Sequence, residues 1–276
     1  MIMKARSAPT PDPSALPIGS PRVTAPEALP KRDLFGVQVT AAGPEAVVDQ
    51  VMHWAHQRRS AAVDFMPVHG LMEAVRNPHH RRRMNGFDLV ACDGQPVRWA
   101  LNRFHDARLP ERVYGPTTML AVCRRCAREG VGIYLYGGRP AVLEQLSYRL
   151  LAEVPELKIV GAESPPFRAL TPEEDDKVVR RINASGAGVI FLGIGCPRQE
   201  VFAAEHRDRL RGVQLCVGAA FDFHAGAVRQ APGWMQRRGL EWLYRLTREP
   251  KRLWRRYLVT NSLFVAYFTR RQLLGR

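Results

Sequence analysis

The chain has 276 residues, of which 46% are hydrophobic, so it can bury a large core without disulfide bonds. Its five cysteines are odd in number and irregular in spacing, which argues against a disulfide framework and for a reducing compartment. No apolar segment has the length of a membrane span or the pattern of a signal peptide, so we expect a cytoplasmic protein. The formal net charge is +15, and residues 229–276 alone hold twelve basic against two acidic residues. A basic tail of this kind indicates an anionic partner, which would be nucleic acid, lipid headgroups or a phosphorylated substrate.

Residues 1–33 are rich in Pro, Ala and Ser without an apolar period, and we predict a disordered leader there. Residues 34–232 alternate short apolar runs with helical patterns. The runs predict strands at 37–39, 61–68, 89–91, 132–136, 157–160, 189–193 and 213–217. The helical patterns predict helices at 44–58, 70–84, 94–104, 116–129, 139–153, 172–185 and 197–209. Such alternation is typical of βαβ units, so we predict an α/β domain with a Rossmann-like sheet of mainly parallel strands flanked by helices.

The most informative segment is residues 189–200, where a short apolar run enters a Gly-x-Gly-x-Pro turn. In an open α/β sheet, ligands bind beyond the carboxyl ends of the strands. The candidate ligand-binding residues of this turn are therefore Gly195, Arg198, Gln199 and Glu200.

Other predicted strand ends carry further candidates. Asp93 is placed for general-base chemistry, although an Asp before Gly also serves as a turn or helix cap. Arg112 precedes a predicted helix, where it can present its guanidinium to a phosphate or form a surface ion pair. Asp222 can accept hydrogen bonds from substrate hydroxyls, and His224 is a candidate base or metal ligand. No second ligand stands at metal-binding spacing and no Asp-x-Asp pair follows a strand, so we predict no metal site, and arginines are expected to neutralise a leaving phosphate.

Residues 233–276 carry no strand signal, and their Trp, Tyr, Leu and Arg residues recur at helical spacing. We predict a basic, aromatic appendage of two or three helices. Unless Pro250 interrupts the helix, four arginines share one face of it: Arg245, Arg248, Arg252 and Arg255. Arginines interleaved with aromatic residues are used by membrane-interface helices, and the alternative is a solvated basic helix packed on the domain.

Several motifs occur together in a fixed order. They are Cys92-Asp93-Gly94, Arg112-Val113-Tyr114-Gly115, Gly193-Ile194-Gly195-Cys196-Pro197-Arg198-Gln199-Glu200, Gly218-Ala219-Ala220-Phe221-Asp222, Arg229-Gln230-Ala231-Pro232, Glu241-Trp242-Leu243-Tyr244-Arg245 and Arg252-Leu253-Trp254-Arg255-Arg256-Tyr257. In these motifs, residues 34–268 resemble the WecG/TagA/CpsF glycosyltransferases. The resemblance implies a metal-independent, inverting enzyme without a cofactor, which moves a hexose or N-acetylhexosamine from a nucleoside diphosphate sugar, with UDP as the expected nucleotide. The implied acceptor is an undecaprenyl-diphosphate-linked saccharide in surface or exopolysaccharide biosynthesis.

The resemblance also implies residue roles. Asp93 matches the general base that deprotonates the acceptor hydroxyl. The substrate-pocket positions are matched by Arg112, Gly195, Gln199 and Asp222. Arg245, Arg252 and Arg255 match the family's C-terminal arginines. These are thought to close over the site and neutralise the leaving diphosphate when the appendage meets the anionic inner face of the plasma membrane. Many members have Thr-x-Asn near the first pocket strand, whereas this chain has Phe65-Met66-Pro67, which leaves His69 as the candidate there. Because family members are often oligomeric, the resemblance also allows a homo-oligomer.

Two other classes of function are alternatives to this interpretation. A nucleic-acid-binding protein explains the charge of the tail but leaves the loops at the sheet edge without a role, and salt-sensitive binding to DNA would favour it. A Rossmann dehydrogenase is a weaker match, because the Gly193-x-Gly195 turn occurs late in the chain and lacks the third glycine of the dinucleotide fingerprint. We therefore expect no nucleic-acid partner.

Overall fold

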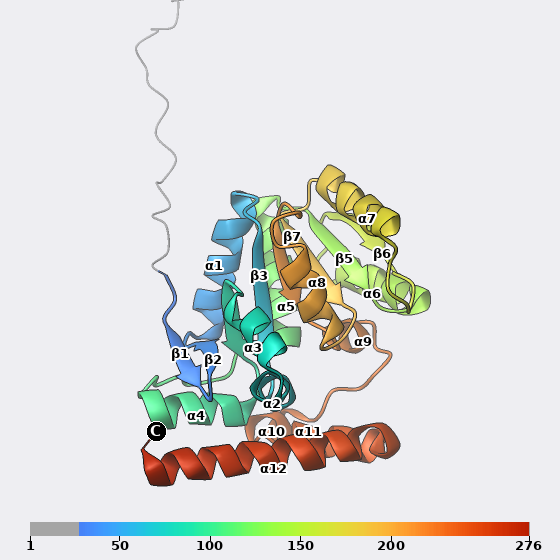
Figure 1. The fold of residues 1–276 in the computed structure, drawn as a ribbon. Helices are drawn as coiled ribbons and strands as arrows, with labels where there is room; N and C mark the ends of the chain where they lie inside the picture. The colour runs from blue at the N-terminus through green and yellow to red at the C-terminus, as the bar shows by residue number, and fades with distance from the viewer. Residues whose placement is uncertain (1–27, 276) are drawn as a thin grey trace, which may run out of the picture.

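Eight strands form one sheet, in the order β1-β2-β4-β3-β8-β7-β5-β6, in the computed structural model of the protein, which describes residues 28–275 (Figure 1). The strands are β1 (Lys31–Leu34), β2 (Val37–Thr40), β3 (Ala61–Met66), β4 (Leu89–Cys92), β5 (Ile133–Gly137), β6 (Ile159–Glu163), β7 (Val189–Gly193) and β8 (Val213–Cys216). Neighbouring strands are parallel except β1 and β2, which form an antiparallel hairpin at one edge. The predicted α/β fold with a mainly parallel sheet is confirmed.

The predicted leader extends too far along the chain. Residues 31–33 belong to β1, while residues 1–27 lie outside the part of the chain that the structure describes. Three of the four residues of β1 are charged, and only Leu34 is fully buried. An edge strand of this kind pairs on one side only and carries no apolar run, so its sequence gave no strand signal.

Helices cover both faces of the sheet. They are α1 (Pro44–His56), α2 (Val68–Arg76), α3 (Pro78–Asn85), α4 (Gln95–His105), α5 (Gly115–Glu129), α6 (Pro140–Glu153), α7 (Pro172–Ser185), α8 (Arg198–Glu205) and the short α9 (Ala220–His224). Contacts between helices place α1, α5 and α6 on one face and α2, α3, α7 and α8 on the other. Right-handed crossovers explain this division. The connections through α1, α5 and α6 run along the sheet toward β6, and those through α2 and α3, α7 and α8 run in the opposite direction.

The prediction of one helix over 70–84 is wrong. The chain forms α2 and α3 there, separated by Asn77 in an extended conformation. Pro78 disfavours a helical residue before it, and the Asn77 side chain accepts hydrogen bonds from the backbone N–H groups of His79 and His80. The Asn-Pro pair therefore ends one helix and caps the next.

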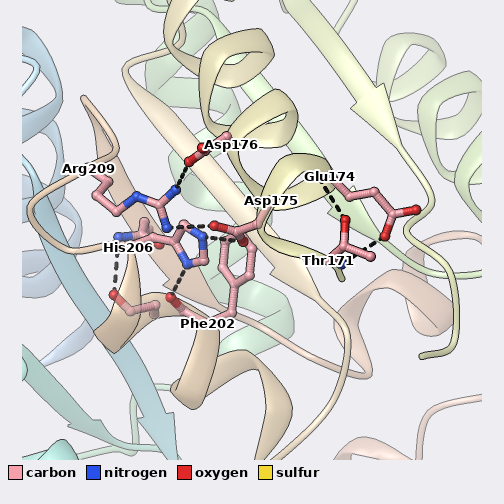
Figure 2. Close-up of polar contacts among 9 residues, drawn as sticks. Thr171, Glu174, Asp175, Asp176, Phe202, His206 and Arg209 are labelled. Atoms are coloured by element: carbon pink, nitrogen blue, oxygen red, sulfur yellow. Dashed lines mark hydrogen bonds and ion pairs between the residues drawn. The ribbon is translucent and has the colours of Figure 1, made fainter. Parts of the chain in front are cut away.

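Polar contacts tie α7 to α8 on the same face (Figure 2). The predicted start of α7 is confirmed, since Thr171 and Glu174 form a capping box. His206, which follows α8, is buried against the ring of Phe202, and its Nε2 lies 2.8 Å from Asp175 Oδ1. Its Nδ1 lies 2.8 Å from the Phe202 carbonyl oxygen, so both ring nitrogens face acceptors. These contacts fix the two helices that form the far wall of the cavity described below.

Three further helices follow the sheet: α10 (Gly233–Arg237), α11 (Glu241–Arg248) and α12 (Pro250–Leu274). Figure 1 shows α12 crossing the molecule beside α2 and α4, and the buried side chains of Leu253, Thr260 and Phe264 anchor it. The face of four arginines predicted for a continuous helix is not formed, because α11 ends at Arg248 and α12 begins at Pro250. Within residues 28–275, no helix combines the length and apolar character needed to cross a membrane.

Candidate active site

A cavity of about 1810 Å³ lies between the carboxyl edge of the sheet and the C-terminal helices α11 and α12. Its walls come from the loops after β3, β4, β5, β6, β7 and β8, with further side chains from α11 and α12. A site for one small ligand typically has a volume of about 300–1,000 Å³, so this cavity has room for two substrates side by side. The predicted placement of the candidate site at the carboxyl edge agrees with this geometry.

Asp93 follows β4 and projects into this cavity. Its Oδ2 accepts a hydrogen bond from the Gly115 N–H at 3.3 Å, and its side chain is 17% exposed. Burial raises the pKa of Asp93 to about 7, against the lowering effect of Arg112, and the charge of Glu241 adds to the rise. A carboxyl group that titrates near neutral pH can both accept and release a proton, as a general base must.

Arg112 lies between two carboxylates. Its Nη2 donates to Glu241 Oε2 at 2.7 Å, whereas its Nη1 is 3.6 Å from Asp93 Oδ1, beyond a normal hydrogen bond. The guanidinium also lies 4.1 Å from the centre of the Tyr114 ring, and the Tyr114 hydroxyl donates to Glu241 Oε1 at 3.1 Å. The pKa of Tyr114 is raised, first by burial and then by Glu241, so the hydroxyl keeps its proton. Residues from the sheet edge and from α11 thus form one network.

The Gly-x-Gly-x-Pro turn follows β7, and β3 and β8 lie between β7 and the strand β4 that precedes Asp93. Gly195 has a φ of +81°, a conformation that favours glycine, and its carbonyl accepts the Gln199 N–H at 3.0 Å. The Gln199 Nε2 donates to Glu200 Oε1 at 3.1 Å, while its Oε1 has no protein partner. Both Gly195 and Gln199 line the cavity, and the unpaired Gln199 Oε1 is buried behind its wall beside Gly218.

Two buried carboxyl groups support this turn from below. Asp64 on β3 and Glu200 on α8 are 2% and 4% exposed, and each influences the pKa of the other. The pKa of Asp64 is raised well above its usual value by burial and then by the charges of Glu200 and Asp93. We therefore expect this pair to hold a proton at neutral pH, since two like charges cannot both be stable at such a buried place.

A second region of the cavity is rich in arginine. The lining guanidinium groups belong to Arg139, Arg198, Arg245, Arg252 and Arg256. Burial raises the pKa of Asp222, while Arg139, Arg245 and Arg252 act against the rise, so these charges surround one half-buried carboxyl. Arg139 also precedes the N-terminus of α6, where backbone N–H groups and the helix dipole favour an anion. This region suits a phosphate or diphosphate group.

His69 lies in the first turn of α2 and lines the cavity. Burial, followed by the charges of Arg256, His80 and Arg245, lowers its pKa to about 4. The ring is therefore neutral at physiological pH, and its Nδ1 has no hydrogen-bond partner in the protein. Phe65, at the place of the missing Thr-x-Asn, is buried at the cavity wall near Gly115. A neutral His69 can exchange one hydrogen bond with a ligand.

The structure does not bring every predicted residue to the cavity. Arg255 is exposed on α12, with its guanidinium 5.9 Å from the centre of the Trp254 ring, and Arg256 faces the cavity instead. Arg248 lies against the ring of Tyr244. His224 Nε2 lies 2.8 Å from the Pro116 carbonyl oxygen and is not part of the cavity wall.

Sequence reasoning missed four residues of the site as functional groups. They are Asp64, Arg139, Glu241 and Arg256. Arg139 follows the Gly137-Gly138 turn at a helix start, which is a signal that can be read from the sequence. Glu241 meets Arg112 across 129 positions of chain, and no local pattern reports such a contact.

Among residues 28–275, no three His, Cys, Asp or Glu side chains gather in a way that suits a metal ion. Residues 32–276 match the sequence model of the Glycosyl transferase WecG/TagA/CpsF family. The match covers nearly the whole described chain, including the sheet, the cavity and all three C-terminal helices.

Proposed function

The chain belongs to the WecG/TagA/CpsF family of glycosyltransferases, and from this premise we propose that it transfers a hexose or N-acetylhexosamine, with inversion, from a UDP sugar to an undecaprenyl-diphosphate-linked saccharide. The observation that carries the proposal is the pairing, within one cavity, of a buried carboxyl group that titrates near neutral pH with a separate cluster of arginines. Both substrates of such a transfer need room, and the cavity exceeds the volume that one of them requires.

Asp93 is the base of the proposed reaction. The acceptor hydroxyl gives its proton to the Asp93 carboxylate as its oxygen attacks the anomeric carbon, and the bond from that carbon to the diphosphate oxygen breaks. A single displacement of this kind inverts the anomeric centre. Arg245 and Arg252 lie near Asp222 and stabilise the negative charge that develops on the leaving diphosphate, without a metal ion. Gln199 and neutral His69 supply hydrogen bonds to the sugars.

The exposed face of α12 is the proposed membrane contact. Large apolar side chains recur on it at helical spacing: Trp254, Leu258, Val265 and Leu273, exposed by 51%, 62%, 61% and 77%. Lys251, Arg255 and Arg270 are exposed on the same helix. Apolar and basic residues on one helix face suit the headgroup region of an anionic membrane, so the enzyme binds peripherally to the inner face of the plasma membrane. Exposed Arg255 then serves lipid contact rather than the diphosphate.

The test is a glycosyl-transfer assay. The full-length protein is incubated with a panel of nucleoside diphosphate sugars and a lipid-diphosphate-linked saccharide in anionic liposomes, with EDTA present, and the release of nucleoside diphosphate is measured. We expect release that requires the acceptor and tolerates EDTA for at least one donor. Release that stops with EDTA and returns with Mg²⁺ would contradict the metal-independent mechanism, and no release with any donor would contradict the proposed substrates.

A further inference from the structure

Glu241 is the first residue of α11, and its carboxylate reaches back to the sheet edge. One oxygen accepts from Arg112 at 2.7 Å and the other accepts from the Tyr114 hydroxyl at 3.1 Å. The side chain is 15% exposed, so these contacts are made in a partly dehydrated setting where charge pairs are strong. Through Glu241, α11 contacts Arg112 and Tyr114. Two charges of α11 act on Asp93, since Glu241 raises its pKa and Arg245 lowers it.

Arg112 lies within ion-pair distance of two carboxylates, those of Asp93 and Glu241. A guanidinium carries five N–H donors and pairs most strongly with a carboxylate through two parallel hydrogen bonds. Asp93 and Glu241 both lie within reach of Arg112, yet the short contact is to Glu241 and the contact to Asp93 is long, at 3.6 Å. Arg112 bridges the two carboxylates through different nitrogens, and its short hydrogen bond to Glu241 leaves Nη1 at ion-pair distance from Asp93 rather than in a hydrogen bond with it.

We propose that Glu241 is a positioning residue that holds Arg112 away from Asp93, so that docking of α11 leaves the carboxylate of Asp93 open to the acceptor hydroxyl. The proposal rests on the proposed function in taking Asp93 as the base. It adds a role for the appendage that is distinct from neutralising the diphosphate. When α11 leaves the sheet edge, Arg112 turns to Asp93, occupies its Oδ1 and makes it a weaker base.

Tyr114 makes the arrangement specific. Its ring supports one face of the guanidinium, and its hydroxyl fixes the Glu241 oxygen that Arg112 does not use. A neutral hydrogen-bonding residue at position 241 would keep part of this contact but would no longer compete for the charge of Arg112. The electrostatic role of Glu241 can therefore be separated from its role as a packing group.

The test is a titration of Asp93 itself in the full-length protein. Carboxyl carbons of aspartate are labelled with ¹³C, Asp93 is assigned by its loss in Asp93→Asn, and its NMR signal is followed with pH in the wild type and in Glu241→Gln. Loss of the Glu241 charge lowers the pKa of Asp93 directly, and an arginine that closes on the carboxylate lowers it further by roughly one unit or more. We therefore expect the midpoint to fall from about 7 in Glu241→Gln, and to fall clearly less when the same substitution is made in Arg112→Gln. The acidic limb of the pH profile of kcat/KM is expected to move by the same amount.

Glu249→Gln is the matched control. It removes a carboxylate from the same segment of the appendage, but Glu249 is paired with Arg252 instead of Arg112. We expect its Asp93 midpoint to stay at the wild-type value. Glu241→Asp keeps the charge on a shorter side chain, and its midpoint is expected between those of the wild type and Glu241→Gln, even where the two variants lose the same thermal stability.

An unchanged Asp93 midpoint in Glu241→Gln would overturn the inference, as would an equal fall in Glu249→Gln or a fall of the same size when Arg112 is already replaced by Gln. Neither result touches the proposed function, which depends on transfer activity in the wild type. Conversely, a wild type that transfers no sugar leaves the titration interpretable, because the readout needs no substrate. A loss of activity in Glu241→Gln with an unmoved pH profile would show that Glu241 only holds α11 in place.

Discussion

Replacing Asp93 by Asn changes how the stability of the protein depends on pH. The pKa of Asp93 is about 7 in the folded protein and 3.8 for a free side chain, so folding favours the protonated carboxyl. Its contribution to stability is fully present below pH 3.8 and is lost as the pH rises through 7. Asn cannot ionise, so the variant lacks this loss, and Asp93→Asn becomes more stable relative to the wild type as the pH rises.

The magnitude follows from the two pKa values. At about 1.4 kcal/mol per pH unit, the full loss is about 4 kcal/mol, of which about 2.5 kcal/mol falls between pH 5 and pH 8. Urea unfolding of both proteins at pH 5 and pH 8 measures the difference in the free energy of unfolding, and all other titrating groups are common to both. We expect the difference to shift by about 2.5 kcal/mol in favour of the variant. Parallel stability curves over this range would refute the argument that Asp93 is a buried, poorly compensated carboxyl.

Three other predictions concern the arginines, the turn after β7 and the appendage. Arg252→Ala raises the KM for the nucleotide sugar by roughly tenfold or more, because a charged contact to the diphosphate is lost. Arg255→Ala mainly lowers cosedimentation with anionic liposomes. Equal effects of the two substitutions on the KM would contradict the placement of Arg255. Gly193→Ala lowers the free energy of unfolding by about 1–3 kcal/mol, since the added methyl group overlaps the ring of Phe221, and a wild-type urea midpoint would exclude that overlap. Truncation after Gly233 releases the protein from liposomes and abolishes transfer, and full activity of the truncated chain would show that the C-terminal arginines are dispensable.

Much of the site was predictable because it depends on sheet topology. Asp93, Gly195 and Asp222 each follow a short apolar run, and parallel strands bring such ends to one edge. The order of the strands did not have to be known for this inference. Arg112 was a candidate for a different reason, its place before a predicted helix. That reasoning did not identify its partners, because its ion pair with Glu241 joins segments 129 residues apart.

Helical periodicity failed where the chain turns. A continuous helix would place Arg245, Arg252 and Arg255 on one face, but the break at Glu249 and Pro250 separates Arg245 on α11 from Arg252 and Arg255 on α12. The cavity receives Arg256 in place of Arg255. The same reasoning predicted one helix where α2 and α3 are separated by Asn77 and Pro78. In both cases the proline at the first helical position marks the start of a new helix, which the apolar period around it does not show.

The central claim is that Asp93 is the base of a glycosyl transfer, and the most direct measurement is the acceptor-dependent release of nucleoside diphosphate by Asp93→Asn. The assay is run at pH 8 beside the wild type, with equal protein shown to be folded. The account predicts turnover lower by roughly 10²–10⁴-fold, because the acceptor hydroxyl loses its general base. Turnover close to that of the wild type would contradict it and remove Asp93 from the mechanism.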